Sequence, residues 1–456
     1  MLIDLSYLRY PLPPDVQRLF EAGEYARMER VIAARLADSR TPETLKKRLT
    51  FQLAIAREIP ASYPLTRSAL LAQLQGAIRD FMPEELEALR DDGTLDWRYV
   101  EGEVRFRDNC LSNLLKTRPE FAQRAVDQTS IAASLAERAE LDAMITRMKR
   151  KGHARARFVL HEEMTVDSTR LTPGETLHIH LPLPVVGAQV VSAELLSCSH
   201  KPAFIADPEE PHRTAYFELP YQPGMTVSAE LAYEIDAPYM KPDPAAVSNL
   251  QPDFDTGEEA PHIVFTPYIR ALTKEIVGTE RNPLLKARRI YDFITTQAVY
   301  RFMPPYMTVT NIPEYFLTGL RGDCGVQAVS FITLCRCAGI PARWQAGLYT
   351  TPREAGNHDW AMFYVAPYGW LYADCSFGGS AYRAGSEERR DFYFGNLEPW
   401  RLPLCVGFQQ AFTPPRRFLR RDPYDNQNGE VETLTRRLDR SEYDTDCRVV
   451  SYEEIE

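Results

Sequence analysis

The chain has 456 residues, of which 44% are hydrophobic and 25% charged, a composition typical of an ordinary globular protein long enough for several domains. Its formal net charge of −10 and pI near 5.5 argue against nucleic acid or an anionic membrane as a partner. Because no basic region precedes a long apolar run and no apolar stretch approaches ~18 residues, we expect neither a signal peptide nor a transmembrane helix.

The first third of the chain is dominated by helical periodicity. Apolar residues recur at helical spacing in VQRLFEAGEYARMERVIAARLAD and in TPETLKKRLTFQLAIAREI. Residues 95–100 and 104–106, joined by Glu101-Gly102-Glu103, predict one short β-hairpin. The basic residues of this part are interleaved with Glu, which favours a solvated helix face over a nucleic-acid surface. We interpret residues 1–152 as a mainly helical N-terminal domain.

From residue 153 the hydrophobic pattern alternates instead. Strand candidates follow closely, with Pro and Gly between them: ARARFVLHEEMTV, ETLHIHLPLPV, QVVSAELLSCS, AYFELPY and MTVSAELAYEID. This pattern predicts a β-sandwich over residues 153–236. His178 and His180 would share one face of a strand, as a metal-binding pair would. No cysteine or carboxylate cluster accompanies them, so we predict sheet-surface histidines and no metal site.

Three segments follow the predicted sandwich. Residues 237–261 are rich in Pro and acids and lack periodicity, which is typical of a linker or of a long arm wrapped across a domain interface. Residues 262–413 contain the motifs with catalytic chemistry and are predicted to form the catalytic domain. Residues 414–456 are interpreted as a charged C-terminal tail with one strand candidate, CRVVSYEEI, and no functional assignment.

A buried helix with a cysteine at its start lies at the centre of the predicted catalytic domain. Residues 325–338 are apolar on nearly all sides. Asp323 is the expected N-cap, Gly339 ends the helix and Pro341 prevents its continuation. Cys324 therefore lies in the first turn, where unpaired N–H groups and the helix dipole favour thiolate over thiol. We expect Cys324 to be the one abnormally acidic thiol among the eight cysteines.

Two strands after this helix carry the partners of the cysteine. Gly356-Asn357 predicts a turn, after which His358 opens the strand DWAMFYVA. The turn at Pro367-Tyr368-Gly369 leads into the strand WLYAD, which ends on Asp374. Cys324, His358 and Asp374 thus occur in chain order as nucleophile, base and orienting carboxylate.

The expected register leaves a gap between the two partners. If Ala366 pairs with Trp370, the even-numbered residues of the hairpin share one face. His358 and Asp374 then lie on that face but about four residues apart along the strands, roughly 13 Å. We expect a bulge or a bent entry at His358 to close this gap.

The same motifs resemble those of a known family. GDCGVQAVSFITLCRCAGIPAR, HDWAMFYV and GWLYADCSF look like the nucleophile helix and the two partner strands of the transglutaminase-like superfamily, here as a bacterial transglutaminase-domain protein. The resemblance covers residues 261–408. It implies a papain-like fold in which a nucleophile helix packs on an antiparallel sheet, within an α+β protein. One departure is Cys375, which stands where the family usually has proline and puts a second thiol beside the site.

The resemblance implies acyl transfer from an amide of a peptide or protein through a thioester on Cys324. Tyr300 would supply an O–H donor to the oxyanion or serve as a core tyrosine, and Tyr306 is a weaker candidate. Water as acceptor makes a peptidase or amidase, whereas an amine makes a protein cross-linker. Deglycosylation of glycosyl-asparagine and a non-catalytic protein-binding module are the other readings. We favour hydrolysis, because Trp360 and Trp370 are explained by strand packing rather than by a tunnel for lysine.

Cysteine usage gives an expectation about the compartment. Eight irregularly spaced cysteines in a chain of this length favour free thiols in a reducing environment. We expect a cytoplasmic protein with no native disulfide and no cofactor. The oligomeric state is left open by the sequence.

Overall fold

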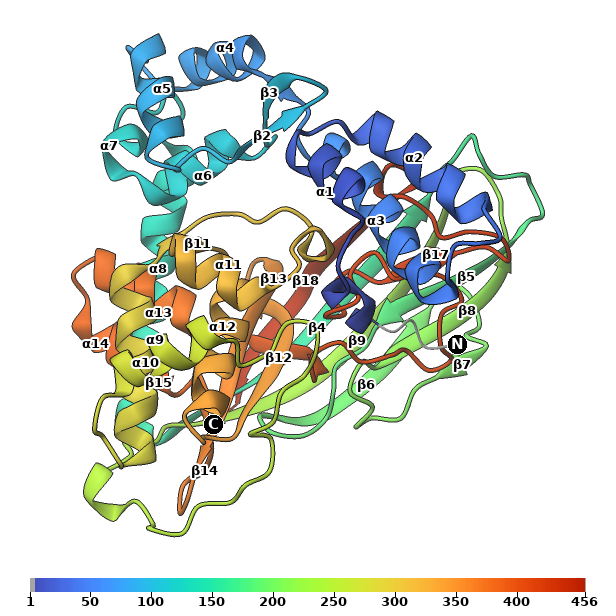
Figure 1. Cartoon of the computed structure of the whole chain (residues 1–456). Coiled ribbons are helices and arrows are strands. Elements are labelled where there is room, and N and C mark those ends of the chain that lie inside the picture. The colour runs from blue at the N-terminus through green and yellow to red at the C-terminus, as the bar shows by residue number, and fades with distance from the viewer. Residues whose placement is uncertain (1–4, 456) are drawn as a thin grey trace.

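The computed structural model describes residues 5–455, except for the side chains of residues 130 and 131. It consists of N-terminal helices, two four-stranded sheets that face each other, and a five-stranded sheet covered by helices (Figure 1). The strand pairs within these three larger sheets are antiparallel. The predicted α+β class is therefore confirmed.

The N-terminal region contains helices and one small sheet. Its elements are η1 (Leu5–Arg9), α1 (Pro14–Glu21), α2 (Tyr25–Ala37), α3 (Glu43–Ser62), β1 (Leu65–Thr66), α4 (Arg67–Ala77), α5 (Pro83–Asp91), β2 (Trp97–Val100), β3 (Glu103–Phe106), α6 (Cys110–Thr117), α7 (Pro119–Ala122) and α8 (Thr129–Lys151). Strands β2 and β3 pair antiparallel, so the predicted hairpin is confirmed. Apolar side chains of α4, α5 and α6 form a small core of their own, whereas those of α1, α2 and α3 join the main core.

The alternating residues after position 152 form two stacked sheets. Their strands in this part of the chain are β4 (His153–Val166), β5 (Thr176–Pro182), β6 (Val190–Cys198), β7 (Phe204–Ile205), β8 (Thr214–Pro220) and β9 (Met225–Pro238). One sheet has the order β18-β4-β9-β6 and the other β17-β5-β8-β7. Met164 and Leu231 from the first sheet and Phe217 from the second meet in one apolar core, as the period of two requires for facing sheets.

The C-terminal residues contribute an outer strand to each of these sheets. β17 (Glu430–Glu432) pairs with β5, and β18 (Tyr443–Ile455) pairs with β4 along its whole length; the one-turn η4 (Arg440–Glu442) lies between them. The strand expected at 447–455 is present and begins at Tyr443. The segment interpreted as a tail is thus built into the two stacked sheets, next to strands far away in the sequence.

The predicted catalytic domain is a helix-covered antiparallel sheet with the order β15-β14-β13-β12-β16. The elements are α9 (Pro267–Val277), α10 (Pro283–Gln297), β10 (Val299–Tyr300), η3 (Tyr306–Thr308), α11 (Ile312–Gly319), β11 (Arg321–Gly322), α12 (Cys324–Cys337), β12 (Ala342–Thr350), β13 (Ala355–Val365), β14 (Gly369–Ala373), α13 (Cys375–Arg383), α14 (Glu387–Phe392), β15 (Phe394–Gly395) and β16 (Arg401–Val406). Helix α12 is buried along most of its length. It packs on β13, where the rings of Phe331 and Phe363 meet edge to face at 5.8 Å.

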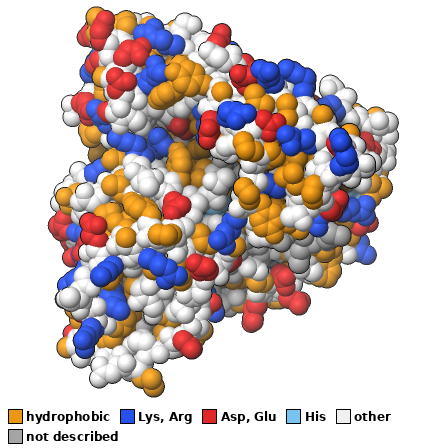
Figure 2. Space-filling view, in the orientation of Figure 1, with side chains coloured by type: hydrophobic (Ala, Val, Ile, Leu, Met, Phe, Trp, Pro, Cys, Tyr) orange, Lys and Arg blue, Asp and Glu red, His pale blue; other side chains and the backbone are white. Residues whose placement is uncertain are grey.

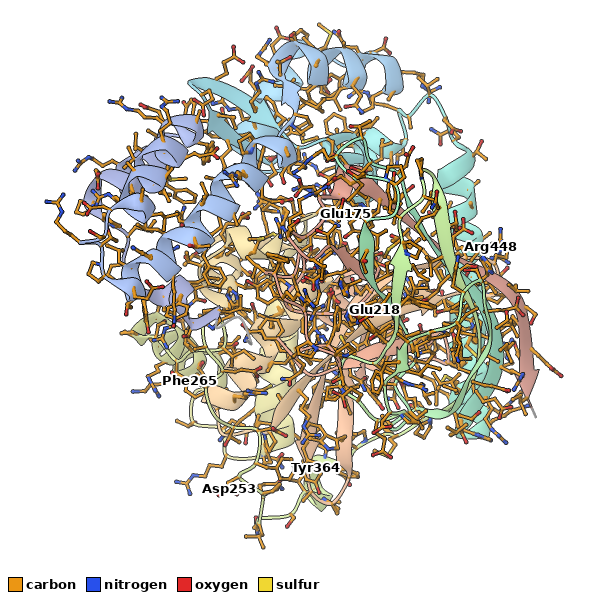
Figure 3. All side chains as sticks on the ribbon, turned by 90° about the vertical axis from the view of Figure 1, so that its right-hand side faces the viewer. Glu175, Glu218, Asp253, Phe265, Tyr364 and Arg448 are labelled. Atoms are coloured by element: carbon orange, nitrogen blue, oxygen red, sulfur yellow. The ribbon has the colours of Figure 1, made fainter. Side chains whose placement is uncertain are left out.

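Residues 239–261, which include η2 (Pro244–Ala246), run along the outer end of the β13–β14 hairpin. The Ser248 backbone N–H donates to the Ala366 carbonyl oxygen at 2.9 Å. Figure 3 shows Asp253 of this segment near Tyr364 of β13 at one end of the molecule. None of these residues lines the cleft described below.

Two surface features bear on the classes of partner considered from the sequence. Within residues 5–455, no helix combines the length and the apolar character needed to cross a bilayer. The face seen in Figure 2 carries basic and acidic side chains interspersed, without an extended area of one sign. On this face, therefore, the charges do not sum to a broad field that would attract a polyanion.

Candidate active site

Cys324 is the first residue of α12, at the position that the sequence predicts. Asp323 precedes it as the N-cap, and its carboxylate accepts a hydrogen bond from the Val326 backbone N–H at 3.3 Å. After the helix, Gly339 has a φ of +80°, the left-handed conformation of a C-terminal glycine. Both end signals are local, which explains why the helix was predictable to within one residue.

The thiol of Cys324 contacts a carboxyl group that the sequence analysis did not single out. Its Sγ donates a hydrogen bond to Oδ2 of Asp359 at 3.4 Å. Gly325 permits this approach, because a Cβ there would lie 2.7 Å from the same Oδ2 and 2.1 Å from the Tyr306 hydroxyl oxygen. Within residues 5–455, the structure gives Cys324 no hydrogen bond to the imidazole of His358.

The expectation that Cys324 is an unusually acidic thiol is wrong for this resting arrangement. The pKa of Cys324 is raised well above its ordinary value, chiefly by burial and then by the carboxyl groups of Asp359 and Asp323. A helix N-terminus contributes only about half a positive charge. Burial and two carboxyl groups outweigh that charge, so the resting cysteine is a protonated thiol.

His358 and Asp374 are brought into direct contact. Nε2 of His358 lies 2.7 Å from Oδ2 of Asp374, and both side chains are buried. Burial lowers the pKa of His358, and Asp374 opposes this effect. Burial acts to raise the pKa of Asp374, but His358 and Arg401 outweigh it and leave that pKa lowered. An ionised Asp374 therefore holds the imidazole with its proton on Nε2 and leaves Nδ1 as the basic nitrogen.

The register of the β13–β14 hairpin differs from the expected one. Trp370 pairs with Tyr364 rather than with Ala366, which shifts the strands by two residues, and the ladder between them is regular. The shift brings His358 and Asp374 to a diagonal cross-strand position, which long side chains can span. The expected bulge or bent entry at His358 is therefore wrong.

The turn before this strand also differs from the prediction. Gly356 and Asn357 belong to β13 and pair with β12. The chain reverses at residues 351–354 instead, where Pro352 has the backbone angle that a turn needs. His358 consequently lies inside the strand, where pairing with β12 fixes its backbone.

A buried arginine completes the surroundings of Asp374. The guanidinium of Arg401 lies 3.0 Å from Asp374 and 3.0 Å from Glu398, and none of the three side chains is accessible to solvent. The ring of Phe377 lies 4.1 Å from the guanidinium carbon. Arg401 therefore balances carboxylates that no water solvates.

Tyr300, the candidate oxyanion donor, lies beside the thiol. Burial raises the pKa of Tyr300, and its interactions with Cys324, including a side-chain hydrogen bond, act in the same direction. Lys116 of α6 places its Nζ 3.9 Å from the centre of the Tyr300 ring. The Tyr306 hydroxyl donates to Asp323 and so supports the N-cap. The N-terminal region thus supplies a cation close to the nucleophile candidate.

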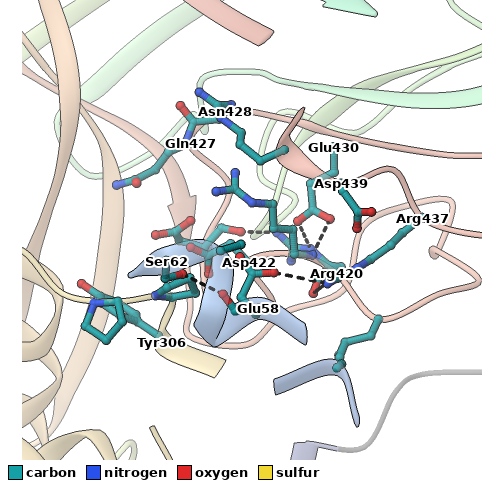
Figure 4. Close-up of a pocket in the computed structure, with 18 of the residues that line it drawn as sticks. Glu58, Ser62, Tyr306, Arg420, Asp422, Gln427, Asn428, Glu430, Arg437 and Asp439 are labelled. Atoms are coloured by element: carbon teal, nitrogen blue, oxygen red, sulfur yellow. Dashed lines mark hydrogen bonds and ion pairs between the residues drawn. The ribbon is translucent and has the colours of Figure 1, made fainter. Parts of the chain in front are cut away.

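Cys324 opens into a cleft of about 1420 Å³. Its walls come from α3, from residues 302–306 and from the C-terminal segment at 417–443. Figure 4 shows Glu58 of α3, Tyr306 and Arg437 of the C-terminal segment around this space. Cys324 and Asp359 line the cleft, whereas His358 and Asp374 do not.

Gln427 of the C-terminal segment holds the carboxyl group that contacts the thiol. Its Nε2 donates to Oδ1 of Asp359 at 2.8 Å and to the His358 carbonyl oxygen at 3.1 Å. The next residue, Asn428, accepts a hydrogen bond from Asn357 at 3.0 Å. No local sequence pattern predicts these contacts, because they join segments that meet only in the folded chain.

The histidine pair considered from the sequence is buried rather than on the sheet surface. His178 shares a hydrogen bond with Tyr216 and His180 one with Thr214, and their side chains are almost inaccessible to solvent. The part of the chain that the structure describes contains no group of three or more His, Cys, Asp and Glu side chains arranged to hold a metal ion.

Replacing Asp359 with asparagine is expected to make Cys324 more reactive. The substitution removes a carboxyl group that favours the thiol, and the amide can donate a hydrogen bond to a thiolate. Near neutral pH we expect alkylation by iodoacetamide to be on the order of tenfold faster, equivalent to about 1.4 kcal/mol. Mapping the label by peptide mass measures this rate at each cysteine. An unchanged rate at Cys324 would show that Asp359 does not control the thiol, and Asp446→Asn, at an exposed position, is the control.

Comparison with known families places these residues in a recognised domain. Residues 270–375, which include Cys324, His358 and Asp374, match the family model described as the Transglutaminase-like superfamily. A Haemophilus influenzae protein named "Uncharacterized protein" is 26% identical over 183 residues. That match spans 33% of this chain and 48% of the relative, so the chain covers about half of that protein's length.

Two solved structures are similar over larger parts of the chain. A "putative cysteine protease" from Cytophaga hutchinsonii is 14% identical, with 66% of this chain and 91% of that chain covered and a TM-score of 0.40. The periplasmic domain of TgpA from Pseudomonas aeruginosa is 17% identical, with 54% and 95% covered and a TM-score of 0.28.

Proposed function

Because residues 270–375 carry a transglutaminase-like core, we propose that the protein is an enzyme that transfers acyl groups from amides to Cys324. The observation that supports this most directly is the position of the thiol. It starts a buried helix, faces a cleft, and touches the residue next to His358, whose imidazole is held by Asp374. We assign Cys324, His358 and Asp374 the roles of nucleophile, base and orienting carboxylate in this proposal.

In the proposed reaction, Cys324 first exchanges its hydrogen bond to Asp359 for one to Nδ1 of His358. Catalytic hydrogen bonds that are absent from a resting enzyme commonly form when substrate binds. The thiol proton passes to Nδ1 as sulfur attacks the amide carbonyl carbon. N–H groups of the first turn of α12 and the Tyr300 hydroxyl then stabilise the oxyanion.

Collapse of this intermediate breaks the C–N bond. The amine leaves with the proton from His358, and the acyl group remains on sulfur as a thioester. Water then attacks the thioester and gives a proton to His358. The C–S bond breaks, the carboxylic acid leaves, and the thiolate takes the proton back from His358 to restore the thiol. Throughout the cycle Asp374 stabilises the charged imidazole, and Arg401 keeps that carboxylate ionised.

Hydrolysis is the version of this chemistry that the cleft supports best. Its lining is rich in charged side chains, which bind water. Trp360 is buried in the sheet, where its Nε1 donates to Gln345, and neither Trp360 nor Trp370 lines the cleft. An amine must outcompete water at about 55 M unless the site excludes water. We therefore propose a peptidase or amidase, with amine transfer as the alternative outcome.

A panel of peptide amides, with and without a large excess of a primary amine, tests this proposal. We expect free acid as the main product and a loss on the order of 10³-fold or more in Cys324→Ala. Cys337→Ala, at the other end of α12, is the matched control and should retain activity. Dominant amine adducts would identify a cross-linking enzyme, and cleavage confined to glycosyl-asparagine would identify a deglycosylating amidase. No product above the Cys324→Ala blank would favour the binding-module reading.

A further inference from the structure

Many of the residues that line the cleft above Cys324 are arginines. The arginines that line it are Arg57, Arg107, Arg170, Arg417, Arg420, Arg421, Arg436, Arg437 and Arg440, nine in all. Six of them have a carboxylate within ion-pair distance. The other three, Arg107, Arg417 and Arg421, form no ion pair with any residue among 5–455. The cleft therefore holds guanidinium groups whose charge the protein itself does not neutralise by direct contact.

In two of these three guanidinium groups, one hydrogen-bond donor has no acceptor. The Nε atoms of Arg107 and Arg421 are buried and have no hydrogen-bond partner. A buried donor without a partner destabilises the folded state, and more so when the group is charged. A bound anion that accepts from these donors would offset that destabilisation. A carboxylate matches the planar fork of a guanidinium especially well.

The three arginines come from two walls of the cleft. Arg107 follows β3 in the N-terminal region, where it lies 5.8 Å from the centre of the Tyr63 ring. Arg417 and Arg421 belong to the C-terminal segment. An ion pair of 3.6 Å between Arg437 and Glu58 joins that segment to α3 of the N-terminal region (Figure 4). A ligand between these walls would meet positive charge from both.

The carboxyl groups that line the cleft form no ion pair with these three arginines. Three are engaged in ion pairs with the paired arginines: Glu58, Glu430 and Asp439. In four others burial raises the pKa, so each holds a proton more readily than an ordinary carboxyl group: Asp323, Asp359, Asp422 and Asp425. Arg421 counteracts this effect at the adjacent Asp422, although the two side chains form no ion pair. The remaining one, Asp108, is exposed beside Arg107.

We propose that Arg107, Arg417 and Arg421 form an anion subsite that receives a carboxylate of the acyl donor. The enzyme then prefers acidic peptides over neutral or basic ones. This inference rests on the proposed function, because the donor is the peptide whose acyl group Cys324 accepts. The carboxylate comes either from an acidic side chain or from the C-terminus of the peptide.

Two thiol reagents of opposite charge test the subsite without any substrate. In both the anionic sulfonatoethyl and the cationic trimethylammonioethyl methanethiosulfonate, the thiolate attacks the sulfenyl sulfur, forms a disulfide and expels methanesulfinate. The ratio of their rate constants at Cys324, resolved by peptide mass, reports the potential in the cleft. We expect Arg107→Gln and Arg421→Gln each to lower the anionic-to-cationic ratio by about threefold or more. Arg421→Lys, which keeps the charge, should stay within about twofold of the parent.

A matched control separates this effect from general loss of charge or of structure. Arg440→Gln removes an arginine of the same cleft that is paired with the exposed Asp444, and it should leave the ratio unchanged. Melting temperatures verify that all variants are folded. The differences should shrink when salt is raised from about 0.05 M to 1 M, because salt screens the attraction. Equal ratios in the parent, Arg107→Gln and Arg421→Gln would overturn the subsite.

Protection of Cys324 from iodoacetamide by peptides then distinguishes the two sources of carboxylate. A glutamate-rich peptide with an amidated C-terminus is compared with a neutral peptide with a free C-terminus and with its amidated form. At least one of the first two should protect at about tenfold lower concentration than the third, a difference of about 1.4 kcal/mol. Equal protection by all three overturns the proposal. If the anionic-to-cationic ratio of rate constants at Cys324 changes as expected but no amide is cleaved, the subsite is supported and the proposed function fails.

Discussion

Replacing Arg401 with methionine is expected to lower the free energy of unfolding by about 3–5 kcal/mol. The guanidinium touches Asp374 and Glu398, and all three groups are withdrawn from solvent. Without it, two buried carboxyl groups lose their counter-charge, which methionine does not replace. Because Asp374 holds His358, the variant should also lose the activity proposed above.

The midpoint of urea unfolding measures this loss. Arg343→Met is the matched control, because Arg343 pairs with Asp255 at the surface, where such a pair contributes about 0–1 kcal/mol. Adding Glu398→Gln to Arg401→Met should recover part of the loss, since it removes one of the two orphaned carboxyl groups. A shift for Arg401→Met no larger than that of Arg343→Met would show that the buried ion pairs do not stabilise the fold.

At pH 8.5 the Glu162→Gln variant is expected to be more stable than the parent, by on the order of 3–5 kcal/mol. Glu162 lies on β4 opposite Cys447 of β18. Its side chain is 4% exposed, and neither carboxyl oxygen has a hydrogen-bond partner. Burial raises the pKa of Glu162 to about 8, whereas an unfolded chain ionises this group near its ordinary value of about 4.3.

The sign of the pH dependence follows from the raised pKa. Between about pH 4.3 and pH 8 the folded state keeps a proton that the unfolded state loses, so stability falls as pH rises through this range. Glutamine cannot ionise. The variant and the parent should therefore have the same urea midpoint near pH 4, and their midpoints should diverge at higher pH. Glu163→Gln, whose side chain lies on the other face of β4, should not show the divergence. Urea midpoints measured from pH 4 to 8.5 test this, and parallel profiles for Glu162→Gln and the parent would contradict it.

Helix α12 is the part of the candidate site that local sequence determined best. Asp323 as cap, Gly339 as terminator and an apolar surface on nearly all sides specify α12 without reference to any other segment. The same is true of the alternating strands, whose period of two appears in the structure. The order of Cys324, His358 and Asp374 and their family motifs likewise belong to the sequence alone.

The contacts between these elements were decided by the tertiary structure. The register that joins His358 to Asp374 depends on a shift of two residues, which a strand pattern with period two cannot detect. Neighbouring residues of a strand face opposite sides, so nothing local indicates that Asp359 reaches the thiol. The thiol's raised pKa follows from that contact and from burial, neither of which is encoded in the first turn of the helix.

The walls of the cleft could not be predicted from local sequence either. Residues 414–456 look like a charged tail because their strands are short or exposed and their partners, β5 and β4, lie far away in the sequence. Once paired, they place Gln427 over Asp359 and Arg421 in the cleft. Local sequence thus determined the elements and the order of the reactive groups. Packing between distant segments determined what surrounds those groups, because burial and partner contacts exist only in the folded chain.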